Sequence, residues 1–190
     1  VVDIAMPDPT VIKAADGYFY VYATESTRNV PIMKSKDLVE WTYCNTAFTN
    51  KTRPRFEPKA GIWAPDINYI NGKYVLYYAM SVWGGEQTCG IGVATADSPQ
   101  GPFTDHGKMF RSNEIGVQNS IDPSLLQYEG RNYLVWGSFR GIYVIELTAD
   151  GLSIMSGAKK KRIAGTAFEA VYIHKHGDYY YMFASIGSCC

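Results

Sequence analysis

The chain has 190 residues, of which 46% are hydrophobic, so it is long enough to bury a substantial core. Its 18 basic and 18 acidic residues give a formal net charge of zero, so it lacks the excess of basic residues that attracts nucleic acid or an anionic membrane surface. No apolar run approaches the ~18 residues that a membrane-spanning helix needs. The sequence therefore favours a neutral partner, with no nucleic acid and no membrane.

Four segments of the chain follow one pattern, and each predicts a β-hairpin. An acidic residue heads a short apolar run, a turn with glycine follows, and a second run rich in aromatic residues comes next. The heading acids are Asp8, Asp66, Asp122 and Glu169, and the turns are Asp16-Gly17, Asn71-Gly72, Glu129-Gly130 and Gly177-Asp178. Third strands are predicted over residues 29–34, 90–95 and 141–147, and no segment has helical periodicity.

The hairpins recur at a nearly regular interval. Successive turn glycines lie 55, 58 and 47 residues apart, and a repeat of this length built only of strands is typical of a β-propeller. The first strands of propeller blades line the central axis, so the heading acids should converge there. At this spacing the chain holds about three and a half blades, and an open propeller exposes apolar faces. We therefore expect one propeller domain over residues 1–190, incomplete at its C-terminus and unable to form a closed, stable monomer alone.

Six short motifs, in this order, carry a resemblance to a known family. They are Pro7-Asp8-Pro9, Trp63-Ala64-Pro65-Asp66, Asn119–Pro123, Trp136-Gly137-Ser138-Phe139, Phe168-Glu169-Ala170 and Gly187-Ser188-Cys189-Cys190. Over essentially its whole length the chain resembles glycoside hydrolase family 43, and within it the arabinan-degrading members. The resemblance implies an all-β, five-bladed propeller that acts on a neutral plant cell-wall polysaccharide or oligosaccharide. It also implies a secreted or periplasmic protein, although no signal peptide stands at the N-terminus.

The resemblance implies three catalytic carboxylates. Asp8 would be the general base, Glu169 the general acid, and Asp122 the residue that orients the acid and tunes its protonation. Hydrolysis of a glycosidic bond with inversion needs two carboxyl groups about 6.5–9.5 Å apart, one protonated to donate to the leaving oxygen and one ionised to deprotonate water. Acids that converge on one axis provide this arrangement, whereas scattered surface acids do not.

The resemblance also places five residues at the substrate: Trp63, Asp66, Asn119, Ser138 and Phe139. For Asp66 the residues alone favour a simpler role, a carboxylate at the start of a strand that accepts backbone N–H groups. Trp83 is equally suited to stacking on a sugar and to packing in the core. At Ile62 the family's arabinanases usually have Phe, and at Arg140 they often have Trp, so endo and exo action both stay open.

No cofactor is required for this chemistry. The family's arabinanases place a metal ion in the axial channel through a histidine of the last blade, so a structural calcium is possible, but its ligand is not in this chain and none is assigned. The three histidines (His106, His174 and His176) are expected at the surface or in hairpins, and the basic run Lys159–Arg162 in a solvated loop or edge. The Cys189-Cys190 pair is expected in buried packing, with a strained disulfide or a metal site as the alternatives.

Three functions follow from this interpretation. The first is hydrolysis of α-L-arabinosidic bonds in arabinan with inversion of configuration. The second keeps the fold and changes the sugar, to a β-xylosidase or an arabinofuranosidase acting on xylan side chains. The third is a non-catalytic carbohydrate-binding propeller, which the three acids argue against because a scaffold needs no carboxylates on its axis.

Overall fold

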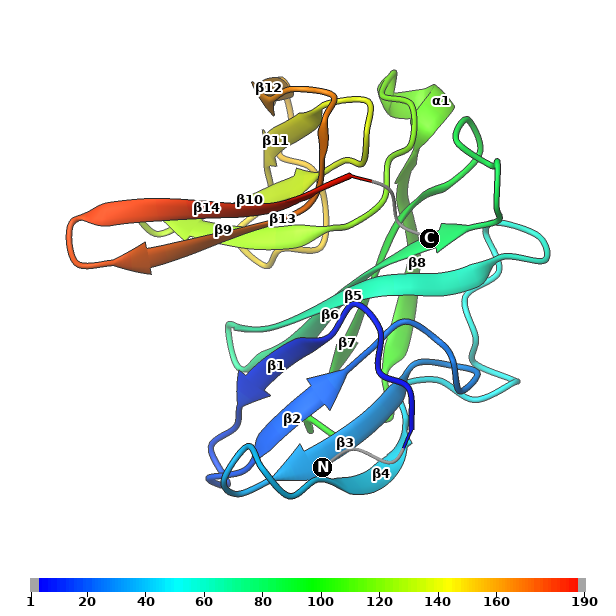
Figure 1. The fold of residues 1–190 in the computed structure, drawn as a ribbon, viewed down its shortest axis with the longest axis vertical. Coiled ribbons are helices and arrows are strands. Elements are labelled where there is room, and N and C mark those ends of the chain that lie inside the picture. The colour runs from blue at the N-terminus through cyan, green and yellow to red at the C-terminus, as the bar shows by residue number, and fades with distance from the viewer. Residues whose placement is uncertain (1–3, 188–190) are drawn as a thin grey trace.

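The computed structural model describes residues 4–187 and arranges them as three four-stranded sheets and one two-stranded sheet, all antiparallel (Figure 1). In each sheet the strands lie in chain order. The first sheet contains β1 (Thr10–Lys13), β2 (Phe19–Tyr22), β3 (Pro31–Ser35) and β4 (Thr42–Thr46); the second contains β5 (Gly61–Ile70), β6 (Lys73–Ser81), β7 (Gly90–Ala96) and β8 (Thr104–Arg111); the third contains β9 (Ser124–Tyr128), β10 (Arg131–Trp136), β11 (Ile142–Glu146) and β12 (Lys161–Ala164); the last contains β13 (Phe168–His176) and β14 (Tyr179–Ile186).

These sheets are the blades that the repeat predicts. Each predicted hairpin is present, and the three complete blades plus one hairpin match the expected three and a half blades. The first strands β1, β5, β9 and β13 contact one another in succession, as the innermost strands of a propeller do. One expectation is wrong in detail. A short helix, α1 (Ser112–Ile115), follows β8, because the Glu114 carboxylate caps the Arg111 backbone N–H and Gly116 ends the turn at φ 66°.

The hydrophobic core lies between neighbouring blades, and β6 shows how the sequence builds it. After Lys73, all residues of β6 are buried, as expected for a strand covered on both faces. Leu76 and Tyr78 pack in the cluster shared with the first blade, whereas Val75 and Tyr77 pack in the cluster shared with the third. This alternation follows from the two-residue period of a strand. A third cluster joins β10 and β11 to β13 through Val135, Ile142 and Val171.

The last hairpin differs from the other blades in its exposure. Figure 1 shows β13 and β14 projecting away from the rest of the molecule. Every residue of β14 is exposed, with exposed fractions of 70% for Tyr179, 59% for Phe183 and 72% for Ile186. Apolar blade faces of this kind are covered in a closed propeller. The expectation that further blades complete this one stays a prediction.

Two further observations concern the described residues. Between residues 4 and 187 there is no helix long and apolar enough to cross a membrane. Cys44 and Cys89 are free thiols, the first half-buried and the second buried. The Cys189-Cys190 pair and the end of the last family motif lie outside the described residues.

Candidate active site

The four innermost strands share one bent backbone position, which comes just before β1 and β9 and lies near the start of β5 and β13. A residue with positive φ stands there in each blade: Asp8 (48°), Ala64 (40°), Asp122 (56°) and Ala170 (50°). Two residues later the regular ladder to the second strand is in place, through Thr10, Asp66, Ser124 and Tyr172. Left-handed backbone is strained for residues other than glycine, although aspartate tolerates it better than most. The bend therefore lies at the N-terminal end of each innermost strand, which is also where the candidate acids lie.

The heading acids therefore do not share one repeat position, which corrects the sequence analysis. Asp8 and Asp122 occupy the bend, Glu169 lies one residue before it, and Asp66 lies two residues after it. In the second blade Ala64 takes the place of the acid. The bend coincides with a bulge in β5, between Trp63 and Asp66, and in β13, between Glu169 and Tyr172, and spacing in the sequence does not reveal where such an extra residue lies relative to an acid.

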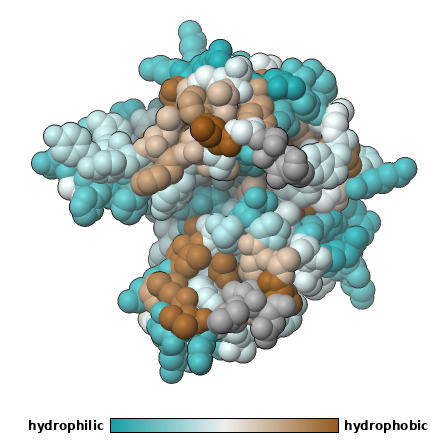
Figure 2. Space-filling model, in the orientation of Figure 1, coloured by the Kyte–Doolittle hydropathy of each residue, from teal (hydrophilic) through white to brown (hydrophobic). Residues whose placement is uncertain are grey.

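All eight predicted site residues nevertheless line one cavity of about 1150 Å³. They are Asp8, Trp63, Asp66, Asn119, Asp122, Ser138, Phe139 and Glu169. The cavity also receives Thr24 and the loop over residues 81–86. Figure 2 shows this face of the molecule hollowed between the first blade, at the bottom, and the last hairpin, at the upper left. The innermost strands of all four blades thus deliver side chains to the same space.

Asp122 is the electrostatic centre of this cavity. Burial, together with the nearby Glu169 and Asp8 carboxylates, raises the pKa of its carboxyl to about 7, because burial and like charges both disfavour ionisation. The Ala170 backbone N–H donates to Asp122 Oδ2 at 3.2 Å, which opposes this rise in pKa. Asp122 is thus able to hold a proton near neutral pH. The expectation that Asp122 keeps Glu169 protonated stays a prediction, since the raised pKa that the structure shows belongs to Asp122.

Two hydroxyl groups hold the other two acids. The Thr24 hydroxyl donates to Asp8 Oδ2 at 2.6 Å, and Asp8 itself is exposed to the cavity. The Ser138 hydroxyl donates to Glu169 Oε2 at 3.0 Å, and Ser138 is only 2% exposed. Asn119 Nδ2 donates to the Ser138 backbone oxygen at 3.0 Å. Ser138 and Asn119 therefore support the acid from behind, and their predicted contact with substrate stays a prediction.

Asp66 serves as a bridge between blades. Its Oδ2 accepts the backbone N–H of Leu125 and the Nδ2 of Asn68, both at 2.7 Å, and Thr10 Oγ1 lies 3.5 Å from Oδ1. Burial raises its pKa to about 6, although these hydrogen bonds pull the pKa down. Asp66 thus has the backbone-capping role that its sequence context favoured, and it fixes the start of β9, three residues after Asp122.

Aromatic side chains form part of the cavity wall. The Trp63 and Trp83 rings lie 5.8 Å apart, centroid to centroid, and both line the cavity. Trp83 is 77% exposed, so of the two roles left open for Trp83, packing in the core is wrong. Phe139 is at φ 50°, and its N–H donates to the Phe168 backbone oxygen at 3.0 Å. Exposed indole faces beside carboxyl groups suit the apolar face and hydroxyl groups of a sugar.

Two groups near the cavity escaped the sequence analysis. The Glu86 carboxylate accepts Arg140 Nε and Nη2 at 3.1 and 2.9 Å, so it ties the loop after β6 to the loop after β10. Thr24, the partner of Asp8, follows β2 by two residues and belongs to no motif. Neither residue carries a local signal, because both act through contacts with distant segments.

The described residues do not form a metal site. Within residues 4–187 no group of three or more His, Cys, Asp or Glu side chains is placed to hold an ion. The structural calcium expected from the resemblance stays a prediction.

Comparison with known proteins agrees with this geometry. Residues 1–190 match the family described as Glycosyl hydrolases family 43. The chain is similar to an extracellular endo-α-(1→5)-L-arabinanase of Bacillus subtilis, with 35% identity over 96% of this chain and 60% of the relative. It is also similar to the structure of a Cellvibrio cellulosa α-L-arabinanase in complex with arabinohexaose (TM-score 0.85, 29% identity, 98% of this chain and 66% of that one). A third match is an exo-1,5-α-L-arabinanase from a bovine ruminal metagenomic library (TM-score 0.82, 32% identity, 97% and 66%). The chain spans about three fifths of the length of the curated relatives it matches.

Proposed function

The chain belongs to glycosyl hydrolases family 43, and on this premise we propose that the protein hydrolyses α-L-arabinosidic bonds in arabinan with inversion of configuration. The observation that carries the proposal is the convergence of Asp8, Asp122 and Glu169 on one cavity, where the charges of Asp8 and Glu169 act on Asp122. Three interacting carboxyl groups are costly to gather, and a binding module has no use for them.

Each acid has a distinct part in the proposed reaction. Asp8 takes a proton from water, which attacks the anomeric carbon, and Glu169 gives a proton to the departing sugar oxygen. Asp122 interacts electrostatically with Glu169 and accepts a hydrogen bond from the N–H of Ala170, the residue after the acid. Its proposed part is to orient Glu169 and to tune its protonation. The water-derived proton ends on Asp8, and exchange with solvent resets both carboxyl groups.

The proposed substrate is a neutral arabinan chain. The relatives named above act on arabinan, and one was solved with arabinohexaose. Trp63 and Trp83 offer apolar faces for the sugar rings, and the large cavity leaves room for more than one of them. One relative is described as endo-acting and another as exo-acting, so the products decide between the two modes. The B. subtilis relative is named extracellular, and we infer secretion, to the medium or the periplasm, for this protein.

A panel of substrates tests this proposal. Full-length protein is incubated with debranched arabinan, arabinoxylan and an aryl arabinoside, and reducing ends are measured. We expect the wild type to release reducing ends from debranched arabinan. Asp8→Asn and Glu169→Gln should each reduce this release by about 100-fold or more. Asp97→Asn is the control, because Asp97 is exposed and forms an ion pair with the exposed Lys73. Release from arabinoxylan alone means a xylan side-chain enzyme, and no release from any substrate means a binding module.

A further inference from the structure

Thr24 lies where the first two blades meet at the cavity. It follows β2, and its backbone N–H donates to the Pro7 oxygen at 2.9 Å, so it fixes the main chain just before Asp8. Its hydroxyl oxygen accepts the Ala64 N–H at 2.7 Å, across the boundary between the blades. One residue therefore links the strained start of the first blade to the equivalent bend of the second.

The hydrogen-bond pattern fixes the direction of the Thr24 hydroxyl. A hydroxyl has one proton to donate, and the Ala64 N–H is able only to donate. The remaining partner is Asp8 Oδ2 at 2.6 Å, so the proton of Thr24 points at that oxygen. Among residues 4–187 no other group donates to Asp8, so Oδ1 is the carboxylate oxygen left for water.

The segment behind Thr24 is anchored in the protein interior. Glu25 N–H donates to the Ile62 oxygen at 3.1 Å, and the Ile62 N–H donates back to Glu25 Oε1 at 2.9 Å. The Arg53 guanidinium forms an ion pair with Glu25, and both side chains are less than 10% exposed. Thr24 and Glu25 thus attach to the start of β5 through three hydrogen bonds, and a buried ion pair joins Glu25 to Arg53.

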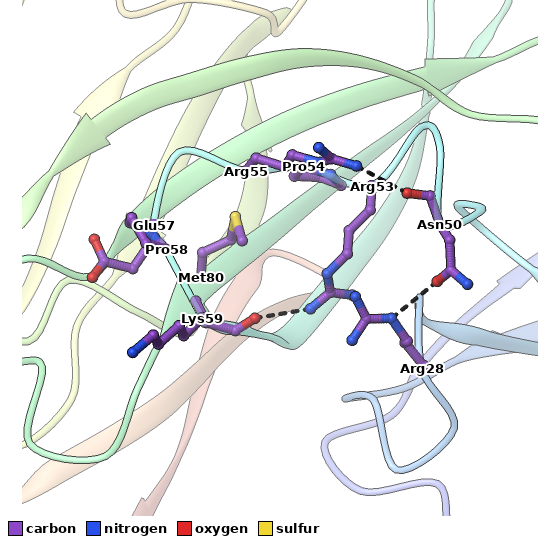
Figure 3. A pocket seen from close by; sticks show the side chains of 10 residues that line it. Arg28, Asn50, Arg53, Pro54, Arg55, Glu57, Pro58, Lys59 and Met80 are labelled. Carbon is purple, nitrogen blue, oxygen red and sulfur yellow. Dashed lines mark hydrogen bonds between the residues drawn. The ribbon is translucent and has the colours of Figure 1, made fainter.

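A basic pocket lies beside this ion pair and includes Arg53 in its lining. It measures about 390 Å³ and is lined by Arg28, Arg53, Arg55 and Lys59, as Figure 3 shows. Arg53 is the buried cation of this pocket, and its two terminal nitrogens donate hydrogen bonds to Glu25, to Asn29 and to the Ala60 oxygen. Arg28 and Arg55 are both turned to Asn50. Among the described residues the pocket therefore offers no free buried donor for an anion, and its Arg53 holds Glu25, the residue after Thr24.

We propose that Thr24 is a positioning residue for the general base. By holding Oδ2 at the boundary between the first two blades, Thr24 sets the rotation of the Asp8 carboxylate and directs Oδ1 at the attacking water. This proposal rests on the proposed hydrolysis. It predicts that Thr24 acts on the chemical step and not on the binding of sugar.

Kinetics of full-length variants test the proposal. Thr24→Val keeps the shape and removes the hydroxyl, whereas Thr24→Ser keeps the hydroxyl. We expect the valine variant to lose about 10- to 100-fold in kcat on debranched arabinan with KM within about 2-fold, and the serine variant to stay within about 3-fold of wild type. Asn45→Ala is the matched control, since it removes another hydrogen bond between the same blades, to the Gln100 oxygen, far from Asp8. Its kcat should be unchanged.

A double-mutant cycle separates positioning from plain structural support. In an Asp8→Asn background, Thr24→Val should cost no further rate, because the group that it positions is already lost. If the valine variant fails to fold, Thr24→Ala takes its place in the same cycle. The role of Thr24 is overturned if the valine or alanine variant has wild-type kcat, or if the serine variant is as slow as the valine variant. Full additivity of Thr24→Val with Asp8→Asn overturns it as well. Wild-type protein that hydrolyses none of the substrates overturns the proposed function, and this role with it.

Discussion

The Asp122 carboxyl should make the protein less stable at high pH, and its replacement by asparagine should reveal this. Its pKa is about 7 in the folded protein, against 3.8 for an ordinary aspartate. Because the folded-state pKa is raised, its contribution to stability is fully present below about pH 4 and is lost as pH rises through 7. The difference of about 3 pKa units corresponds to a penalty of up to about 4 kcal/mol at pH 8 and about 1 kcal/mol at pH 4.5.

Asparagine keeps the shape of Asp122 and its hydrogen bond from the Ala170 N–H, because the amide oxygen accepts this N–H as the carboxylate does. Asp122→Asn should therefore raise the free energy of unfolding by up to about 4 kcal/mol at pH 8 and by much less at pH 4.5, while it lowers activity on arabinan. Such opposition between stability and activity is expected at a functional site.

Urea unfolding of the full-length wild type and variant at pH 8 and pH 4.5 measures this difference. Asp150→Asn is the control, because hydrogen bonds from Thr148 and from the Leu152 N–H lower the pKa of Asp150, so its replacement should not stabilise. An Asp122→Asn protein that gains nothing at pH 8, or gains equally at both pH values, refutes the reasoning.

Three further predictions follow from particular contacts. Arg53→Ala should destabilise the protein by about 3–5 kcal/mol in urea, because it leaves Glu25 buried without its partner, whereas Lys73→Ala, which breaks an exposed pair, should cost under about 1 kcal/mol; equal costs contradict this. Trp83→Ala should raise KM for arabinan about 2- to 10-fold with unchanged melting temperature, since the ring is exposed in the cavity wall, and a lower melting temperature with unchanged KM contradicts this. Glu169→Gln should lose far more rate on arabinan than on an aryl arabinoside, whose leaving group needs little protonation; equal losses show that Glu169 is not the acid.

The sequence predicts the blades well because hairpins are local. Each turn glycine and its flanking apolar runs lie within about 20 residues, so one segment suffices to indicate a hairpin, and the repeat then indicates the propeller. The eight site residues converge as expected because innermost strands meet at the axis. Helix α1 was missed because four residues are too few to show a period.

The parts that the sequence does not predict depend on register and on long-range contacts. The acid-proline order differs between Asp8-Pro9 and Pro65-Asp66, yet only the hydrogen bond from the Leu125 N–H shows that Asp66 faces the backbone of the next blade. Arg53 and Glu25 are 28 residues apart in irregular segments, so no pattern reveals their ion pair. Thr24 is likewise recognisable only once Asp8 and Ala64 are placed around it.

The anomeric configuration of the first product tests the central claim most directly. Proton NMR during the first minutes of hydrolysis of an arabinan oligosaccharide by full-length protein distinguishes the two anomers before they equilibrate. If Asp8 activates water and Glu169 protonates the leaving oxygen, the first sugar released carries the configuration opposite to that of the substrate. Product that first appears with retained configuration requires a covalent sugar–enzyme intermediate and contradicts the assignment of Asp8 as a base.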